Sequence, residues 1–151
     1  MILLILTTIC SVLIVLLIPK RLTGFEIYVT SLFAATFGAM VDMFLDVKLN
    51  WYGFLSKGID WSYLFIFFVI YPAASTIFLN FFPFKKTWSK RLIYILFFSV
   101  ITTVFEFIAS KYSNVFYHND WKLIYSAVCY PFIYLIMALH FKYVRSKTSH
   151  F

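Results

Sequence analysis

The sequence predicts an all-α fold: a polytopic membrane helix bundle with five transmembrane helices, its N-terminus outside and its C-terminus cytoplasmic. The first observation is composition, since 63% of the 151 residues are hydrophobic, 23% are aromatic and only 13% are charged. Soluble globular proteins average about 45–50% apolar and about 25% charged residues. A chain of this length has too small a core to hide that excess, so much of it must face lipid. We expect a single integral membrane domain over residues 1–151.

The second observation is a series of five apolar runs, each close to the 17–25 residues that cross a hydrocarbon core of about 30 Å. They cover residues 2–18, 26–47, 61–82, 92–110 and 122–141. The first run is followed by Pro19-Lys20-Arg21. A cleaved signal peptide carries its positive charges before the apolar stretch, so we expect this first run to stay in the membrane.

The third observation is the distribution of lysine and arginine, which sets the orientation of multi-pass proteins. With the N-terminus outside, the cytoplasmic segments hold nine basic residues: Lys20, Arg21, Lys85, Lys86, Lys90, Arg91, Lys142, Arg145 and Lys147. The outer segments hold four: Lys48, Lys57, Lys111 and Lys122. The excess predicts this orientation. Because the basic residues form short clusters between apolar runs and no single stripe, nucleic acid is not an expected partner.

The two predicted outer hairpins carry a similar series of residues, which suggests an internal repeat. At an offset of 60 residues, Asp46, Tyr52 and Asp60-Trp61 match Glu106, Tyr112 and Asp120-Trp121. At an offset of 59, Tyr71-Pro72 matches Tyr130-Pro131. Two such copies would be related by an axis along the membrane normal, with a site between them. A chance likeness between aromatic-rich loops is the alternative.

Three acids fall inside or at the end of apolar runs: Asp42, Asp46 and Glu106. An ionisable group at membrane depth costs at least about 2.5 kcal/mol, so each is a candidate functional residue. Four residues apart on a helix, Asp42 and Asp46 share one face about 6 Å apart along the axis. Glu106 lies at a similar depth to Asp42. If two carboxylates converge, one should hold a proton or they should share a cation. The alternatives are hydrogen-bonding between helices and, for Asp46, an ordinary interfacial acid.

The second outer loop adds His118 and Asp120 on the same side as these acids. His118 is a candidate general base or metal ligand, and a solvated loop histidine is the alternative. The spacing matches no known metal signature, so the sequence leaves a metal site undetermined. No cofactor is predicted.

Two Tyr-Pro pairs lie near the middle of the third and fifth runs. Proline removes a backbone donor, so Pro72 and Pro131 predict helix kinks. Tyr71 and Tyr130 are candidate binding residues in a polar interior, Tyr71 with Ser75 and Tyr130 with Ser126 and Tyr134.

Four segments carry a resemblance: IPKR after the first run, LDVKLNWYGFLSKGIDW in the first outer loop, LNFFPFKK in the central inner loop, and FYHNDWKLIYSAVCYP entering the last run. With these the chain resembles an uncharacterised family of small five-span membrane proteins from spore-forming Firmicutes. The resemblance implies a multi-pass protein of the bacterial cytoplasmic membrane. It supplies no mechanism and no site residues.

Three classes of function follow. The first is an outward-facing polar site that binds or conducts a proton, a cation or a small cationic solute, which the acids and the repeat favour. The second is an accessory protein that binds a membrane partner. The third is an enzyme acting on a lipid at the outer leaflet, which is less favoured because no nucleophile or phosphate cradle is identifiable. The expected partner is the lipid bilayer, and a homodimer or a membrane-protein partner remains open.

Overall fold

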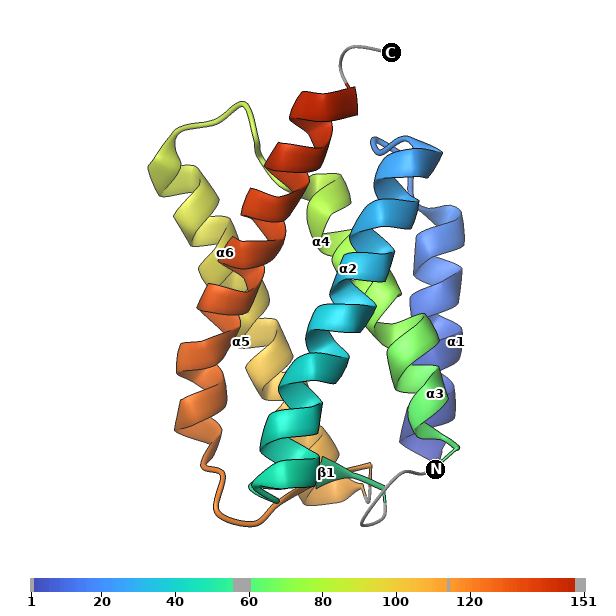
Figure 1. The fold of residues 1–151 in the computed structure, drawn as a ribbon, viewed down its shortest axis with the longest axis vertical. Helices are drawn as coiled ribbons and strands as arrows, with labels where there is room; N and C mark the ends of the chain where they lie inside the picture. Colours follow the sequence, from blue (N-terminus) through green and yellow to red (C-terminus); the bar gives the residue numbers. More distant parts are fainter. Residues whose placement is uncertain (1, 56–60, 114, 149–151) are drawn as a thin grey trace.

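The computed structural model describes residues 2–55, 61–113 and 115–148, which fold into an elongated helical bundle (Figure 1). The helices are α1 (Ile2–Leu17), α2 (Gly24–Asp42), α3 (Tyr63–Phe65), α4 (Tyr71–Phe81), α5 (Trp88–Tyr112) and α6 (Leu123–Thr148). Two π-helical segments extend them: η1 (Met43–Lys48) continues α2, and η2 (Ile66–Ile70) joins α3 to α4. The prediction of an all-α helical bundle is confirmed.

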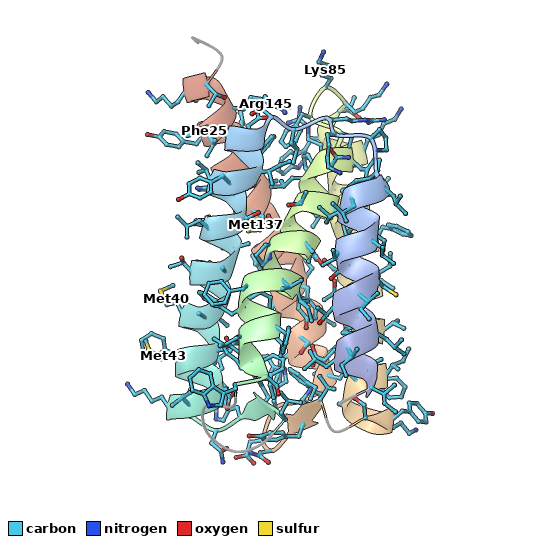
Figure 2. All side chains as sticks on the ribbon, turned by 90° about the vertical axis from the view of Figure 1, so that its right-hand side faces the viewer. Phe25, Met40, Met43, Lys85, Met137 and Arg145 are labelled. Carbon is cyan, nitrogen blue, oxygen red and sulfur yellow. The ribbon has the colours of Figure 1, made fainter. Side chains whose placement is uncertain are left out.

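Four of these continuous helical stretches are long and apolar enough to cross a membrane: Gly24–Lys48, Tyr63–Phe81, Trp88–Tyr112 and Leu123–Thr148. Their outer faces carry large exposed apolar side chains, such as Ile93, Phe97 and Phe132. Phe25, Met40 and Met43 likewise project outward from the α2–η1 helix (Figure 2). Such extensive apolar surface suits lipid and not water. The remaining helix, α1, is apolar but shorter, so the five-span count and the orientation stay predictions.

Two short strands close one end of the bundle. Strands β1 (Tyr52–Phe54) and β2 (Phe116–His118) form an antiparallel ladder with Tyr52 opposite His118 and Phe54 opposite Phe116. We call this end, which also holds the start of α1, the strand end (Figure 1). The sequence did not predict these strands. They bring the two loops that join α2 to α3 and α5 to α6 into direct contact.

The opposite end carries the basic clusters, including Lys85 and Arg145 (Figure 2), and we call it the basic end. Here the buried Glu26 carboxylate accepts from Arg145 Nε at 2.7 Å and from Arg145 Nη2 at 3.2 Å. Glu26 also completes a capping box with Thr23 at the start of α2, which satisfies two backbone donors. The first turn of α2 is therefore fastened to the last turns of α6.

The largest apolar core lies between α2, α4, α5 and α6, nearer the basic end. Phe78 and Phe141 are fully buried in it, and Leu79, Ile95 and Met137 are almost so. A second cluster places Leu4 of α1 against Ile66 and Val115, with Tyr63 and Tyr71 packed beside it. Helix α1 thus covers part of the strand end with an apolar wall.

Candidate functional site

Three tyrosine hydroxyl groups converge on the Asp42 carboxylate, which is only 6% exposed. Tyr52 donates to Oδ1 at 2.7 Å, and Tyr63 and Tyr71 donate to Oδ2 at 2.6 and 2.5 Å. We call these four residues the Asp42 cluster. Hydrogen bonds to an ionised acceptor are roughly twice as strong as neutral ones. The cluster therefore compensates the buried charge with neutral donors and without a cation.

Helix geometry explains how Tyr71 reaches Asp42. A Cβ at Gly38, one turn before Asp42, would lie 2.5 Å from Tyr71 Cε2, so the tyrosine ring rests directly on the Gly38 backbone. The π segment η1 begins immediately after Asp42, and the π segment η2 ends immediately before Tyr71. Such wide turns inside α-helices are frequent at functional sites. The glycine and the altered helical register together bring the hydroxyl to the carboxylate.

Tyr52 reaches the cluster from strand β1. Its ring stacks on Phe116 of β2, with 5.2 Å between ring centroids, and the residue is 7% exposed. Burial, and then the negative charge of Asp42, raise the pKa of Tyr52 well above its usual value. The phenol therefore stays protonated at neutral pH and remains a hydrogen-bond donor.

The Glu106 carboxylate, 4% exposed, lies in a second cluster of different composition. His118 Nε2 lies 2.8 Å from Oε1, Ser126 Oγ donates to the same oxygen at 2.6 Å, and the Tyr130 hydroxyl donates to Oε2. Trp121 Nε1 supports the serine by donating to its Oγ at 2.7 Å. We call Glu106, His118, Ser126 and Tyr130 the Glu106 cluster. His118, with a side chain 19% exposed, connects this buried acid to the surface.

The two clusters are neighbours and do not merge into one site. Each is built within one hairpin: α2–β1–α3–α4 for Asp42 and α5–β2–α6 for Glu106. The ladder places Tyr52 of the first directly opposite His118 of the second, and opposite residues of an antiparallel pair project to one face. The Tyr130 hydroxyl also interacts electrostatically with Asp42. Within the described residues no hydrogen bond joins Asp42 to Glu106.

Asp46 and Asp120 belong to neither cluster. Asp46 is half-buried, and its carboxylate accepts from the Phe54 backbone N–H, which anchors β1. Burial, and then the negative charge of Asp46, raise the pKa of the Tyr117 phenol. The Tyr117 ring lies over Gly53. Asp120 is exposed and forms no hydrogen bond or ion pair with another described residue. Asp60, the other loop aspartate of the predicted repeat, lies outside the described residues.

The prolines behave differently in the two hairpins. Pro72 lies at the junction where η2 gives way to α4, so the loss of its backbone donor coincides with a change of helix type. Pro131 lies within α6, which continues without interruption from Leu123 to Thr148.

Several polar contacts were not anticipated from the sequence. Nothing in the sequence indicated a role for Tyr63. Tyr52, which the sequence marked as a member of the suggested repeat, is buried and donates to Asp42. The ion pair between Glu26 and Arg145 was also missed. The Thr23-x-x-Glu26 spacing of a capping box was readable and would have marked the start of the helix.

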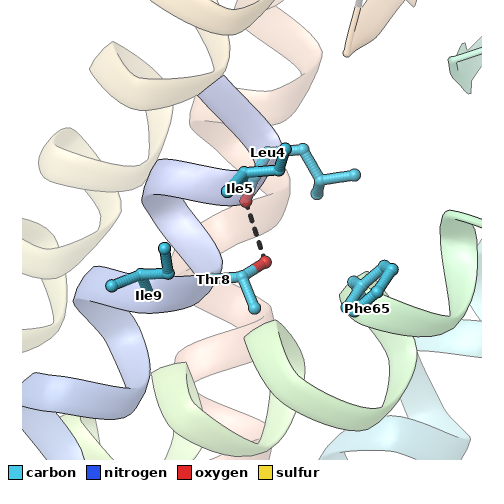
Figure 3. Close-up of a pocket in the computed structure, with 5 residues that line it drawn as sticks. All are labelled: Leu4, Ile5, Thr8, Ile9 and Phe65. Atoms are coloured by element: carbon cyan, nitrogen blue, oxygen red, sulfur yellow. Dashed lines mark hydrogen bonds between the residues drawn. The ribbon is translucent and has the colours of Figure 1, made fainter. Parts of the chain in front are cut away.

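The groove between α1 and α3, of about 240 Å³, is apolar (Figure 3). Leu4, Ile5, Ile9 and Phe65 line it, and the Thr8 hydroxyl there donates to the Leu4 carbonyl of its own helix at 2.8 Å. The groove offers no polar group to a ligand. Among the described residues, no three His, Cys, Asp or Glu side chains gather in a way that could hold a metal ion.

No protein-family model, curated protein or solved structure matches the chain. The two carboxylate clusters are therefore the features from which its function can be inferred.

Proposed function

We propose that the chain is a multi-pass membrane protein that takes up a proton at Glu106 and exchanges it with water through His118. The observation that carries this proposal is the contact between His118 Nε2 and Glu106 Oε1 at 2.8 Å, which links a 4% exposed acid to a 19% exposed imidazole. Histidine is the side chain that most readily exchanges protons near neutral pH. The imidazolium passes one proton to the carboxylate, which becomes a carboxylic acid, and the neutral ring regains a proton from hydronium in the adjoining water.

Hydrogen-bond chemistry favours a proton over a cation as the bound species. A hard cation requires several converging oxygen acceptors. Here both carboxylates face O–H and N–H donors from tyrosine, serine and histidine. A hydroxyl group can both donate and accept, so the same neighbours suit a carboxylate and a carboxylic acid.

Asp42 serves a different purpose in this proposal. All three of its partners are tyrosines, and no described histidine touches it. It fastens β1, α3 and α4 to α2 as a hydrogen-bonding anchor. An accessory protein is the second candidate function. The Asp42 cluster favours it, because a carboxylate that already accepts from three tyrosine hydroxyls can stabilise the fold without binding a ligand.

We further infer a bacterial cytoplasmic membrane location with the strand end outside and α1 as a fifth span. The nine basic residues predicted to be cytoplasmic all lie toward the basic end, and α1 runs beside α4 (Figure 1). Duplication of the hairpin also belongs to this proposal. Glu106 follows Asp42 by 64 residues, and Phe116–His118 follow Tyr52–Phe54 by the same 64. This spacing equates Asp42, in place of Asp46, with Glu106.

Infrared difference spectroscopy of the protein in liposomes tests the proton site, because it resolves the C=O stretch of a protonated carboxylic acid. We expect a carboxylic acid band whose intensity depends on pH. The band should disappear in Glu106→Gln and persist in Asp120→Asn, which changes an exposed acid. His118→Phe should slow its appearance after a pH jump. A wild-type spectrum without a Glu106-dependent band would refute the proposal and leave the accessory function.

A further inference from the structure

Hydroxyl groups continue from Glu106 toward the basic end of the bundle. Tyr130 of α6 donates to Glu106, and one turn further along α6 the Tyr134 hydroxyl lies 2.5 Å from Thr102 Oγ1 of α5. Thr102 itself lies one turn from Glu106 on α5. Tyr94 follows, and its hydroxyl donates to the Phe78 backbone carbonyl at 3.0 Å. These hydroxyls lie along the contact between α5 and α6, which we call the polar seam. Within the described residues, no hydrogen bond joins Tyr130 to Tyr134 or Tyr134 to Tyr94 directly.

Helix α4 adds a buried hydroxyl with spare hydrogen-bonding capacity. Ser75 lies one turn beyond Tyr71 and is 4% exposed, and its Oγ has no partner among the described residues. Buried polar atoms without protein partners are commonly satisfied by internal water. Polar side chains therefore extend into the bundle from both clusters, Ser75 from the Asp42 cluster and the α5 and α6 hydroxyls from the Glu106 cluster, as far as Phe78.

Phe78 ends this polar region. Its side chain is completely buried, and its ring packs against four other rings at centroid distances from 4.6 to 5.5 Å: Phe82, Tyr94, Phe98 and Tyr134. Around it, Leu79, Ile95 and Phe141 form an apolar layer of the core. Closer to the basic end, the buried Asn80 side chain accepts from the Arg21 backbone N–H and donates to the Pro19 carbonyl, so it is already satisfied. A proton moves along a chain of hydrogen-bonding groups, and this layer of aromatic rings offers none at its centre.

The titratable groups around Glu106 come from every element packed against it. They are His118 of β2 and Tyr130 and Cys129 of α6, and the charge of Asp42 acts across Tyr130. Of these, only Tyr130 leads toward the seam.

We propose that Phe78 is the closed barrier of a proton pathway that runs from Glu106 along the hydroxyls of Tyr130, Tyr134 and Tyr94. Protons reach Glu106 from the strand end and do not cross to the basic end. Because no hydrogen bond joins these three hydroxyls directly, transfer between them requires internal water. Each hydroxyl and each water accepts one proton and releases another, so no group changes its net protonation. This inference rests on the proposed proton site.

Voltage-driven proton entry into liposomes tests the barrier. The vesicles contain purified protein and a pH-sensitive dye, and a potassium gradient with valinomycin sets the potential. We expect wild type, Phe78→Leu and the lipid-facing control Phe97→Ala to match empty vesicles. Phe78→Ala should raise the rate of acidification, and adding Glu106→Gln to it should abolish that rise. Circular dichroism verifies folding, and Phe98→Ala replaces Phe78→Ala if the latter does not fold.

Three results would overturn the barrier: proton flux in wild type, no flux in folded variants that lack a barrier ring, or flux that Glu106→Gln leaves unchanged. The infrared band of Glu106 is recorded on the same vesicles. A normal band with no flux in folded Phe78→Ala refutes the barrier alone. Absence of the band in wild type refutes the proton site itself.

Discussion

At the scale of single residues, Asp42 is a hydrogen-bonding anchor, because three hydroxyls donate to one carboxylate. Asparagine keeps the shape but loses the charge, and its amide nitrogen faces a hydroxyl donor. Hydrogen bonds to charged groups contribute about 1.5–3 kcal/mol each, so we expect Asp42→Asn to lose about 3 kcal/mol of stability. Thermal unfolding in detergent measures this loss, with Asp120→Asn as the exposed control. Equal midpoints for Asp42→Asn and wild type would contradict the anchor role.

Gly38 is a second residue with a specific requirement, since a Cβ there would lie 2.5 Å from Tyr71 Cε2. In Gly38→Ala the ring must move, which separates its hydroxyl from Asp42, and overpacking of this kind costs about 1–3 kcal/mol. Gly24→Ala is the matched control on the same helix, because a Cβ at Gly24 meets nothing within 4 Å. The cost of Gly38→Ala should shrink in a Tyr71→Ala background. Additive effects in this double-mutant cycle would show that the contact is not the cause.

The candidate acids Asp42 and Glu106 were predictable from the sequence, because a carboxyl group inside an apolar run is conspicuous. Tyr71 and Tyr130 were identified beside their prolines, and the structure places each on one of the acids. Tyr52 was not assigned to the site, since its contact with Asp42 depends on the path of a loop. The sequence left open whether the acids converge on one site, and the structure places Asp42 and Glu106 in two separate clusters.

At the scale of elements, the ion pair between Glu26 and Arg145 fastens the start of α2 to the end of α6. Breaking a fully buried pair costs about 3–5 kcal/mol. The Arg145 side chain is 42% exposed, so we expect Arg145→Met to lose only about 1–2 kcal/mol. The reason is that Glu26 keeps a buried charge without its partner.

Adding Glu26→Gln to Arg145→Met should restore part of the loss, because glutamine retains the capping geometry without a charge. Lys147→Met, which removes a nearby exposed charge, serves as the control. Thermal midpoints of the four proteins in detergent provide the comparison. A loss of the same size in Lys147→Met would mean that general charge, and not this contact, sets the stability.

The long helices were predictable because an apolar run of membrane length has few alternatives to a helix. The π segments and strands were not. Each strand has only three residues, and its partner lies 64 positions away in the other loop, so local propensity says little about the pairing. The π turns flank the contact between Asp42 and Tyr71, and only the packed structure reveals that contact.

At the scale of the whole molecule, charge is strongly uneven. Among the residues that the structure describes, the basic end holds nine of the 12 lysine and arginine residues and one of the five acids, Glu26. Positive charge near span ends is retained in the cytoplasm, so this asymmetry predicts which end faces outward. Cysteine labelling tests it in a background in which Cys10 and Cys129 are alanine. We expect Asp120→Cys to react with an impermeant reagent in intact cells, and Lys86→Cys only after permeabilisation.

Labelling also decides whether α1 crosses the membrane. At about 1.5 Å per residue its 16 residues extend about 24 Å, less than the hydrocarbon core, so local thinning or the flanking residues must complete a crossing. If it does cross, Ile2→Cys reacts from the same side as Asp120→Cys, and Lys20→Cys from the opposite side. If Ile2→Cys and Lys20→Cys react from the same side, α1 lies on the bundle without spanning. Since the Asp120 label also reports the side of the nearby His118, the same experiment shows which compartment would supply the proton to the proposed site.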